Sequence, residues 1–257
     1  MRGFITAVRT LTIIPVPGRE SERFSLSLPW FPFVGLILGL ILYATGLIWI
    51  KIFAMDWPGG GAIILLAAEI LLTRGLHLDG LADWADAIGG NRGREARLSI
   101  MKDSHLGAFG VLAIMIVLLA KWVALERLFS SGSTICLLFV LVISRDMMVE
   151  LMTTLPYARS GEGMARPFVN GASPYQRAWA HTISLCFCLC FGPAGLVLFG
   201  TGWIITRLFG ASCRRLFGGI TGDLLGATNE MVGVILLMIC AMPGKSILCY
   251  TGWSWLF

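Results

Sequence analysis

Three aspartates spaced along one short segment are the residues best suited to chemistry in this chain. Asp79, Asp83 and Asp86 stand in HLDGLADWADAIGG at 77–90. On a helix they fall within an arc of about 60°, where like charges repel, and the lowered dielectric of a membrane surface strengthens that repulsion. Carboxylate oxygens without His or Cys ligands suit Mg²⁺ or Mn²⁺ shared with substrate phosphates. The spacing predicts a phosphate-handling site with one or two metal ions; an acidic face on an interfacial helix is the alternative.

A second polar segment, IMKDSHLGAFG at 100–110, follows closely. Lys102 is placed to neutralise a phosphate, and Asp103 to add a metal ligand. Ser104 is expected to cap the helix that follows. An ordinary charged loop before an apolar run is the competing interpretation.

A third segment, GGITGDLLGATNE at 218–230, combines two carboxylates with glycines that permit close approach of a ligand. Asp223 and Glu230 are seven residues apart and share a face if the segment is helical. Thr221 and Asn229 would line the same polar surface. Packing of small residues between membrane helices is the alternative.

Basic residues supply candidate groups for binding an anion. The loop at 156–166 is rich in glycine and holds Arg159 and Arg166, which suits an anionic ligand, although a solvated loop would look alike. Arg145 lies with Glu150 inside an apolar run, where ionisable groups are costly and are either functional or paired. Arg145 is therefore expected to contact substrate or to pair with Glu150, and either residue could instead pair with a neighbouring span.

The elements that must position these groups are membrane helices. The 257 residues are 56% hydrophobic and 14% charged, with a mean hydropathy of +0.80, which is more apolar surface than one soluble core buries. This composition excludes a disordered chain and a secreted disulfide scaffold, and the unbroken runs disfavour a β-barrel. We predict one all-α, polytopic membrane domain over 1–257, with about seven transmembrane helices and with cytoplasmic amphipathic helices that carry the acidic site. The apolar runs are 28–50, 60–76, 107–126, 134–152, 179–199, 201–217 and 229–249.

The basic residues also predict an orientation. The net charge is +5, and most arginines fall in segments that seven spans place on one side, which the positive-inside rule makes cytoplasmic. The N-terminus and the polar loops share that side. Arg74 and His77 end the second run there, where Arg74 would serve as an anchor or as a substrate contact. Nucleic-acid binding is not expected, because the charges sit between apolar runs.

Taken together, these segments resemble the adenosylcobinamide-GDP ribazoletransferase family, also called cobalamin synthase. PYAR at 156–159 and the opening FITAVRTLTIIPVP at 4–17 complete a resemblance that covers the chain from end to end. The chain departs from the family's usual residues at Trp84 (for Thr), Ala87 (for Gly), His105 (for Arg) and Gly233 (for Glu). These departures keep every candidate carboxylate, but they remove a hydroxyl at 84 and change the surroundings of the site.

The resemblance implies the last assembly step of adenosylcobalamin, in a bacterial inner membrane. A Mg²⁺-dependent phosphoryl transfer would join adenosylcobinamide-GDP to α-ribazole or its 5′-phosphate and release GMP. The catalytic candidates are then Asp83, Asp86 and Glu230. The candidate metal ligands are Asp79, Asp83, Asp86, Asp103 and Asp223. The candidate substrate-binding residues are Arg74, His77, Lys102, Ser104, Arg145, Arg159, Arg166, Thr221 and Asn229.

Two other functions match parts of the pattern. A CDP-alcohol phosphotransferase of phospholipid synthesis also uses an Asp-Gly string with further aspartates, but the Arg and the downstream D-x3-D of its pattern are missing here. A transporter would suit the intramembrane charges and the glycine-broken run at 201–217, although the sequence shows no repeated halves. Besides its two substrates, the expected partners are the lipid bilayer and a second copy of the chain in a homo-oligomer, in the first instance a dimer.

Overall fold

A computed structural model describes residues 1–53, 56–90, 92–161 and 163–244 of the chain. These residues form helices and no strand, apart from an isolated bridge that pairs Tyr157 with Ile220. The predicted all-α class is therefore confirmed. The helices are α1 (Arg2–Leu11), η1 (Phe24–Trp30), α2 (Phe31–Phe53), α3 (Pro58–Thr73), α4 (Leu76–Ile88), α5 (Arg94–Ile100), α6 (Ala108–Ser131), α7 (Cys136–Thr154), α8 (Arg166–Asn170), α9 (Pro174–Cys190), α10 (Pro193–Phe217) and α11 (Gly222–Ala241).

The predicted apolar runs correspond to long helices except for the run 179–199, which crosses the turn between α9 and α10. Not every one of these helices is long and apolar enough to cross a membrane by itself. Within the described ranges, the segments that meet this requirement are Phe24–Phe53, Ala108–Ser131, Pro193–Phe217 and Gly222–Ala241. The α3–α4 pair meets it only when counted as one span with an 89° bend. Helix α7 carries three charged residues, and α3 and α9 have 16 and 17 residues. The chain is thus a multi-pass membrane protein, and the count of seven spans stays a prediction.

Two predicted helix starts are wrong for local reasons. Helix α10 begins at Pro193 rather than at 201, because Gly192 turns the chain with a φ of 74° and proline suits the first helical position. Helix α11 begins at Gly222 rather than at 229, because the Thr221 hydroxyl accepts a hydrogen bond from the Leu224 amide. The predicted end of that last run, at 249, lies outside the described residues.

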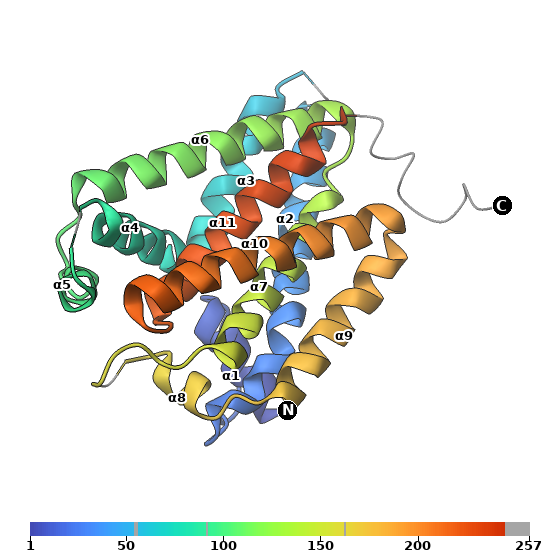
Figure 1. The fold of residues 1–257 in the computed structure, drawn as a ribbon. Helices are drawn as coiled ribbons and strands as arrows, with labels where there is room; N and C mark the ends of the chain where they lie inside the picture. Colours follow the sequence, from blue (N-terminus) through green and yellow to red (C-terminus); the bar gives the residue numbers. More distant parts are fainter. Residues whose placement is uncertain (54–55, 91, 162, 245–257) are drawn as a thin grey trace.

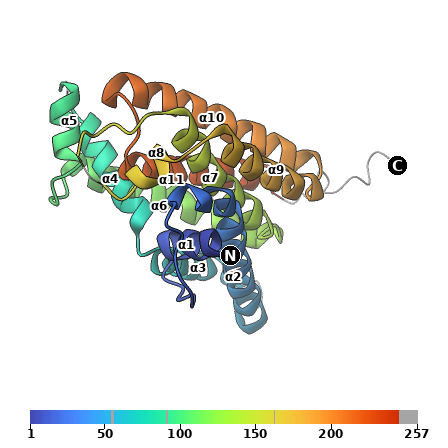
Figure 2. The ribbon, with the colours of Figure 1, turned by 90° about the horizontal axis from the view of Figure 1, so that it is seen from below.

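Helix α7 is the centre of the bundle and packs against α2, α9, α10 and α11. Helix α11 also packs against α4 and α6. The connections α6–α7 and α9–α10 lie toward the top and right of Figure 1, whereas α4, α5 and the α10–α11 turn lie on its left and α1 and α8 at its bottom. Viewed from below, in Figure 2, α4, α5 and the end of α10 again share one side. The polar segments are therefore gathered at one end of the bundle.

A sharp turn between α3 and α4 presents the acidic segment at that end. Arg74 and Gly75 both adopt the left-handed conformation, with φ values of 56° and 65°, and the two helices meet at 89°. Helix α4 is too short to span a bilayer and lies outside the four spanning segments. It crosses α11 closely, because a Cβ on Gly80 would lie 2.5 Å from the Asp223 carbonyl oxygen. The sequence therefore brings the aspartates of α4 against the first turn of α11.

Candidate functional site

The crossing of α4 and α11 collects carboxylates from both helices. Asp79 is exposed and Asp83 is half-buried on α4, while Asp223 stands in the first turn of α11. Burial raises the pKa of Asp83 to about 7, and the negative charges of Asp223 and Asp79 act in the same direction, against the Arg159 guanidinium. Two residues of the predicted α4 face and Asp223 thus share one electrostatic site.

Arg159 joins this site to the loop between α7 and α8. Its Nη2 lies 2.7 Å from Asp223 Oδ2 and 3.1 Å from the Met101 carbonyl oxygen, to which it donates a hydrogen bond. The Thr221 hydroxyl donates to the same Asp223 oxygen at 3.3 Å while capping α11. The structure therefore brings Arg159 and Thr221 to Asp223, with Thr221 fully buried in a capping position.

Asp86 has a structural partner that the sequence interpretation did not anticipate. Its two carboxylate oxygens accept hydrogen bonds from the amides of Gly107 (2.8 Å) and Gly110 (2.9 Å), at the start of α6. Helix α6 has no cap from its own N-cap residue, so Asp86 caps it from α4. A Cβ on Gly107 would lie 2.4 Å from an Asp86 oxygen, which explains a glycine there. The expectation that Ser104 caps this helix is wrong, because α6 starts at Ala108 and Ser104 is exposed on the preceding loop.

The carboxylates of this site suit a divalent cation by their chemistry. All donors are oxygens, and the neighbouring carboxylates help to raise the pKa of Asp83 to about 7, a shift that a bound cation would oppose. In the part of the chain that the structure describes, no three His, Cys, Asp or Glu side chains converge closely enough to hold an ion. A bound Mg²⁺ would therefore draw on one or two carboxylates and on substrate phosphates, which is its usual coordination.

Glu230 lies in a buried ionic cluster instead of beside Asp83. The Lys121 ammonium on α6 lies 2.9 Å from Glu230 Oε2 and 3.0 Å from Glu69 Oε2. Asp223 and Glu230 are two helical turns apart, about 10.5 Å along the axis. The structure thus pairs Glu230 with Lys121. This position does not support the predicted catalytic role of Glu230.

Three further predicted residues surround this ionic cluster inside the bundle. His77 and Arg145 are buried, and both feel the charge of Glu69, as Arg145 also feels that of Glu230. Neither ring nitrogen of His77 has a hydrogen-bond partner among the described residues. Asn229 donates to Glu230 Oε1 at 3.3 Å. None of these three residues is among the groups that act on Asp83, although His77 shares α4 with it.

Arg145 does not pair with Glu150, but the alternative that Glu150 pairs with a neighbouring helix is confirmed. Arg145 Nη1 donates to the Ser144 hydroxyl at 3.0 Å. Glu150 pairs instead with Arg207 of α10 (3.1 Å) and with His181 of α9 (3.0 Å). The cause is helix geometry: Arg145 and Glu150 are five residues apart, which places them on different faces of α7.

Other predicted residues lie around the rim of the site. Lys102 and Asp103 are exposed on the loop between α5 and α6. Asp103 accepts a hydrogen bond from His105, which lowers the pKa of the Asp103 carboxyl and raises that of His105. Asp103 is not among the charges that act on Asp83. Arg74 donates to the Arg9 carbonyl oxygen at 3.2 Å, which ties the α3–α4 turn to α1.

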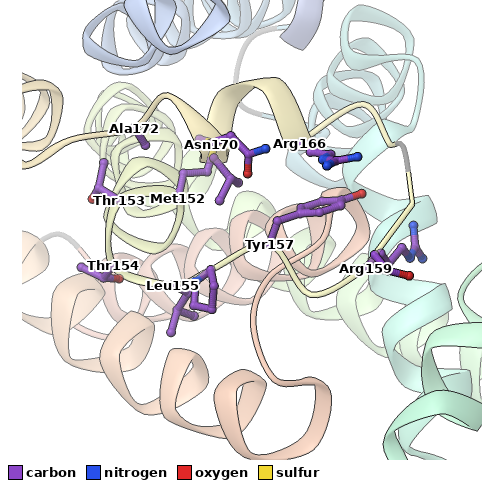
Figure 3. A pocket seen from close by; sticks show the side chains of 12 residues that line it. Met152, Thr153, Thr154, Leu155, Tyr157, Arg159, Arg166, Asn170 and Ala172 are labelled. Atoms are coloured by element: carbon purple, nitrogen blue, oxygen red, sulfur yellow. The ribbon is translucent and has the colours of Figure 1, made fainter.

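Two polar pockets flank the segment 157–160. The α7–α8 pocket has a volume of about 490 Å³ and includes Thr154, Tyr157, Arg166 and Asn170 in its wall. Figure 3 shows the Tyr157 ring in the middle, with Arg159 and Arg166 toward one end and Thr153 and Thr154 toward the other. The α5 pocket, of about 570 Å³, lies on the other side and includes Arg94, Lys102 and Arg159. The Gly-rich basic loop is thus a pocket wall, and it contains both predicted arginines.

Sequence reasoning missed several of these residues. Lys121 and Glu69 are ionisable groups inside apolar runs, the same signal that drew attention to Arg145. His181 stands in a similar position in α9. Tyr157 belongs to the PYAR segment of the family resemblance, but nothing in the sequence indicates that it lines a pocket.

Comparisons with known proteins match this chain to one family over nearly its whole length. The family described as cobalamin-5-phosphate synthase matches residues 3–241. The chain is 41% identical to adenosylcobinamide-GDP ribazoletransferase of Chlorobaculum parvum, over 96% of this chain and 98% of the relative. It is 42% identical to the protein of that name from Chlorobium chlorochromatii, over 93% and 96%, and 41% identical to that from Syntrophobacter fumaroxidans, over 92% and 91%. No solved structure matches the chain.

Proposed function

Because this chain belongs to the cobalamin-5-phosphate synthase family, we propose that its α4–α11 carboxylate site transfers a phosphoryl group between two nucleotide-like substrates. The chain is a transferase of the adenosylcobinamide-GDP ribazoletransferase type, which completes the nucleotide loop of adenosylcobalamin. The family match favours this function over a CDP-alcohol phosphotransferase or a transporter. The substrates are adenosylcobinamide-GDP and α-ribazole or its 5′-phosphate.

The reaction exchanges one P–O bond for another. The 3′-hydroxyl oxygen of α-ribazole attacks the cobinamide-side phosphorus, and a new O–P bond forms. The bond from that phosphorus to the bridging oxygen breaks, and its electron pair leaves with GMP. The hydroxyl proton passes to a base on the protein. Such transfers depend mainly on positioning and on neutralising charge.

Asp83 is the residue we assign as the base. Asp86 is held by two α6 amides and Glu230 by Lys121, whereas Asp83 has no ion-pair partner among the described residues. A carboxyl pKa of about 7 suits a base that works at neutral pH. Asp83 Oδ would accept the proton of the attacking hydroxyl and pass it to solvent.

Asp79 and Asp223 are the residues we assign to hold Mg²⁺, since they stand on two helices and both act on Asp83. When bound, Mg²⁺ supplies positive charge that neutralises the diphosphate oxygens. Arg159 orients Asp223 and presents its guanidinium to phosphate oxygens. Arg166 and Lys102 add positive charge on either side.

The site is proposed to face the cytoplasm of a bacterial inner membrane. The arginine-rich segments and the acidic site share one end of the bundle (Figure 1), and basic residues mark the cytoplasmic side of membrane proteins. A dimer remains the expected assembly.

The observation that carries the proposal is the meeting of Asp83, Asp79 and Asp223 at one helix crossing, with Arg159 bound to Asp223. The test is to purify the protein in detergent, supply adenosylcobinamide-GDP with α-ribazole 5′-phosphate, and follow GMP and cobalamin phosphate with and without Mg²⁺. We expect both products in equal amounts, and only with the divalent ion. Absence of both products from folded protein would contradict the proposed function.

A further inference from the structure

We propose that the segment 157–160 is a wall between two substrate sites: the α5 pocket binds the diphosphate of adenosylcobinamide-GDP, and the α7–α8 pocket binds α-ribazole 5′-phosphate. This assignment rests on the proposed function and adds the place of each substrate. Tyr157, Arg159 and Ser160 line both pockets, so the same short segment forms one side of each.

The wall is fixed from both directions. The Ala158 amide donates to the Ile220 carbonyl oxygen, and the Ile220 amide donates to that of Pro156, both at 2.9 Å. Arg94 donates to the Ala158 carbonyl oxygen at 3.1 Å. These bonds join the wall to the turn that leads into α11 and to α5. A wall held in this way keeps two ligands at a constant separation.

The α5 pocket has the charge that a diphosphate diester requires. Arg94, Lys102 and Arg159 contribute three positive charges and Glu95 one negative charge. Arg159 is already paired with Asp223, so Arg94 and Lys102 supply the remaining positive charge for the diphosphate. Leu98 and Ala158 give it little apolar surface, so it suits phosphates more than an aromatic base.

The α7–α8 pocket has a mixed lining that suits a nucleoside monophosphate. Arg166 faces the Tyr157 side of the pocket, where a phosphate would find charge (Figure 3). Asn170 offers hydrogen bonds to ribose hydroxyls. Leu155 and Val169 provide apolar surface against which an aromatic base can lie. Its volume of about 490 Å³ falls in the ordinary range for small-molecule sites.

Arg159 connects the two pockets to the carboxylates. It lines both pockets and lies 2.7 Å from Asp223. A phosphate in either pocket would therefore lie against the same guanidinium, which is bound to Asp223. The reacting hydroxyl and phosphorus would have to meet at this shared edge of the two pockets, beside Asp223, and not across the wall.

Steady-state kinetics with both substrates varied will test the assignment. We expect Lys102→Met to raise the KM for adenosylcobinamide-GDP about tenfold, the loss of one charge-assisted contact, with the KM for α-ribazole 5′-phosphate unchanged. We expect Arg166→Gln to raise the KM for α-ribazole 5′-phosphate and to leave the KM for adenosylcobinamide-GDP unchanged. Asn170→Ala should have the same effect. Arg92→Ala and Tyr175→Ala remove exposed side chains that line neither pocket and are the matched controls.

The outcomes separate this assignment from the proposed function. Wild-type protein that forms no product contradicts the proposed function. The two-pocket assignment is overturned if the wild type is active and both variants raise the two KM values together. It is also overturned if Lys102→Met raises only the KM for α-ribazole 5′-phosphate and Arg166→Gln raises only that for adenosylcobinamide-GDP. If Arg166→Gln fails to fold, as judged by thermal melting, Asn170→Ala decides the α7–α8 side. The conservative Lys102→Arg variant is expected to keep the KM of the wild type.

Discussion

The close crossing of α4 and α11 gives the sharpest prediction, the effect of Gly80→Ala. The new Cβ would lie 2.5 Å from the Asp223 carbonyl oxygen, where ordinary contact begins at 3.4 Å. The two helices must therefore separate by about 0.9 Å at this point, since the contact is with backbone that cannot turn away. Overpacking of this kind costs about 1–3 kcal/mol of stability.

The same displacement separates Asp79 and Asp83 on one helix from Asp223 on the other. Misplacement of catalytic groups by about 1 Å lowers rates on the order of 100-fold. Gly233→Ala is the matched control, because it lies on α11 and its Cβ would meet nothing within 4 Å. Turnover is measured as GMP release, and folding by thermal melting in detergent. Wild-type turnover by Gly80→Ala would refute the reasoning that this crossing sets the geometry of the site.

Three further predictions follow from named contacts. Asp86→Ala removes the cap of α6, which is expected to lower the unfolding free energy by about 1–2 kcal/mol and to speed hydrogen exchange of the Gly107 and Gly110 amides. Unchanged exchange at these amides would contradict the capping role of Asp86. Lys121→Met leaves the buried Glu230 and the partly buried Glu69 without their cation. It is expected to lower the unfolding free energy by about 3–5 kcal/mol, measured by denaturant titration in detergent, and a loss no larger than that of Arg92→Ala would contradict the stabilising role of these ion pairs. Mg²⁺ affinity, measured by calorimetry, is expected to fall from pH 8 to pH 6, because Asp83 with a pKa of about 7 takes up a proton and loses its negative charge. Equal Mg²⁺ affinities at the two pH values would contradict a site that Asp83 shares with Asp79 and Asp223.

Much of the fold follows from patterns along the chain. Most of the apolar runs coincide with the long helices because spans must satisfy their backbone hydrogen bonds internally and remain apolar outside. The face shared by Asp79 and Asp83 follows from helical periodicity alone. The starts of α10 and α11 could also have been read, since Pro193 and Thr221 are ordinary signals for a first turn.

The partners of the site residues could not be derived in this way. Asp86 meets amides 21 and 24 residues away, and Arg159 meets Asp223 across 64 residues. Spacing identifies which residues share a helix face, but not which other helix that face meets. Glu230 illustrates the difference: it shares α11 with Asp223, yet Lys121 from α6 determines its surroundings. Roles that depend on contacts between helices therefore required the structure.

The most direct test of the carboxylate site is GMP release by Asp83→Asn beside Asp103→Asn. Asp83 lies at the meeting point of the acidic charges, whereas Asp103 pairs with His105 on an exposed loop. If Asp83 is the base, Asp83→Asn should keep the melting temperature of the wild type and lose turnover by two to four orders of magnitude, on the order of a general base's contribution. Asp103→Asn should retain most activity. Near-normal turnover by folded Asp83→Asn protein would contradict the assignment of this site.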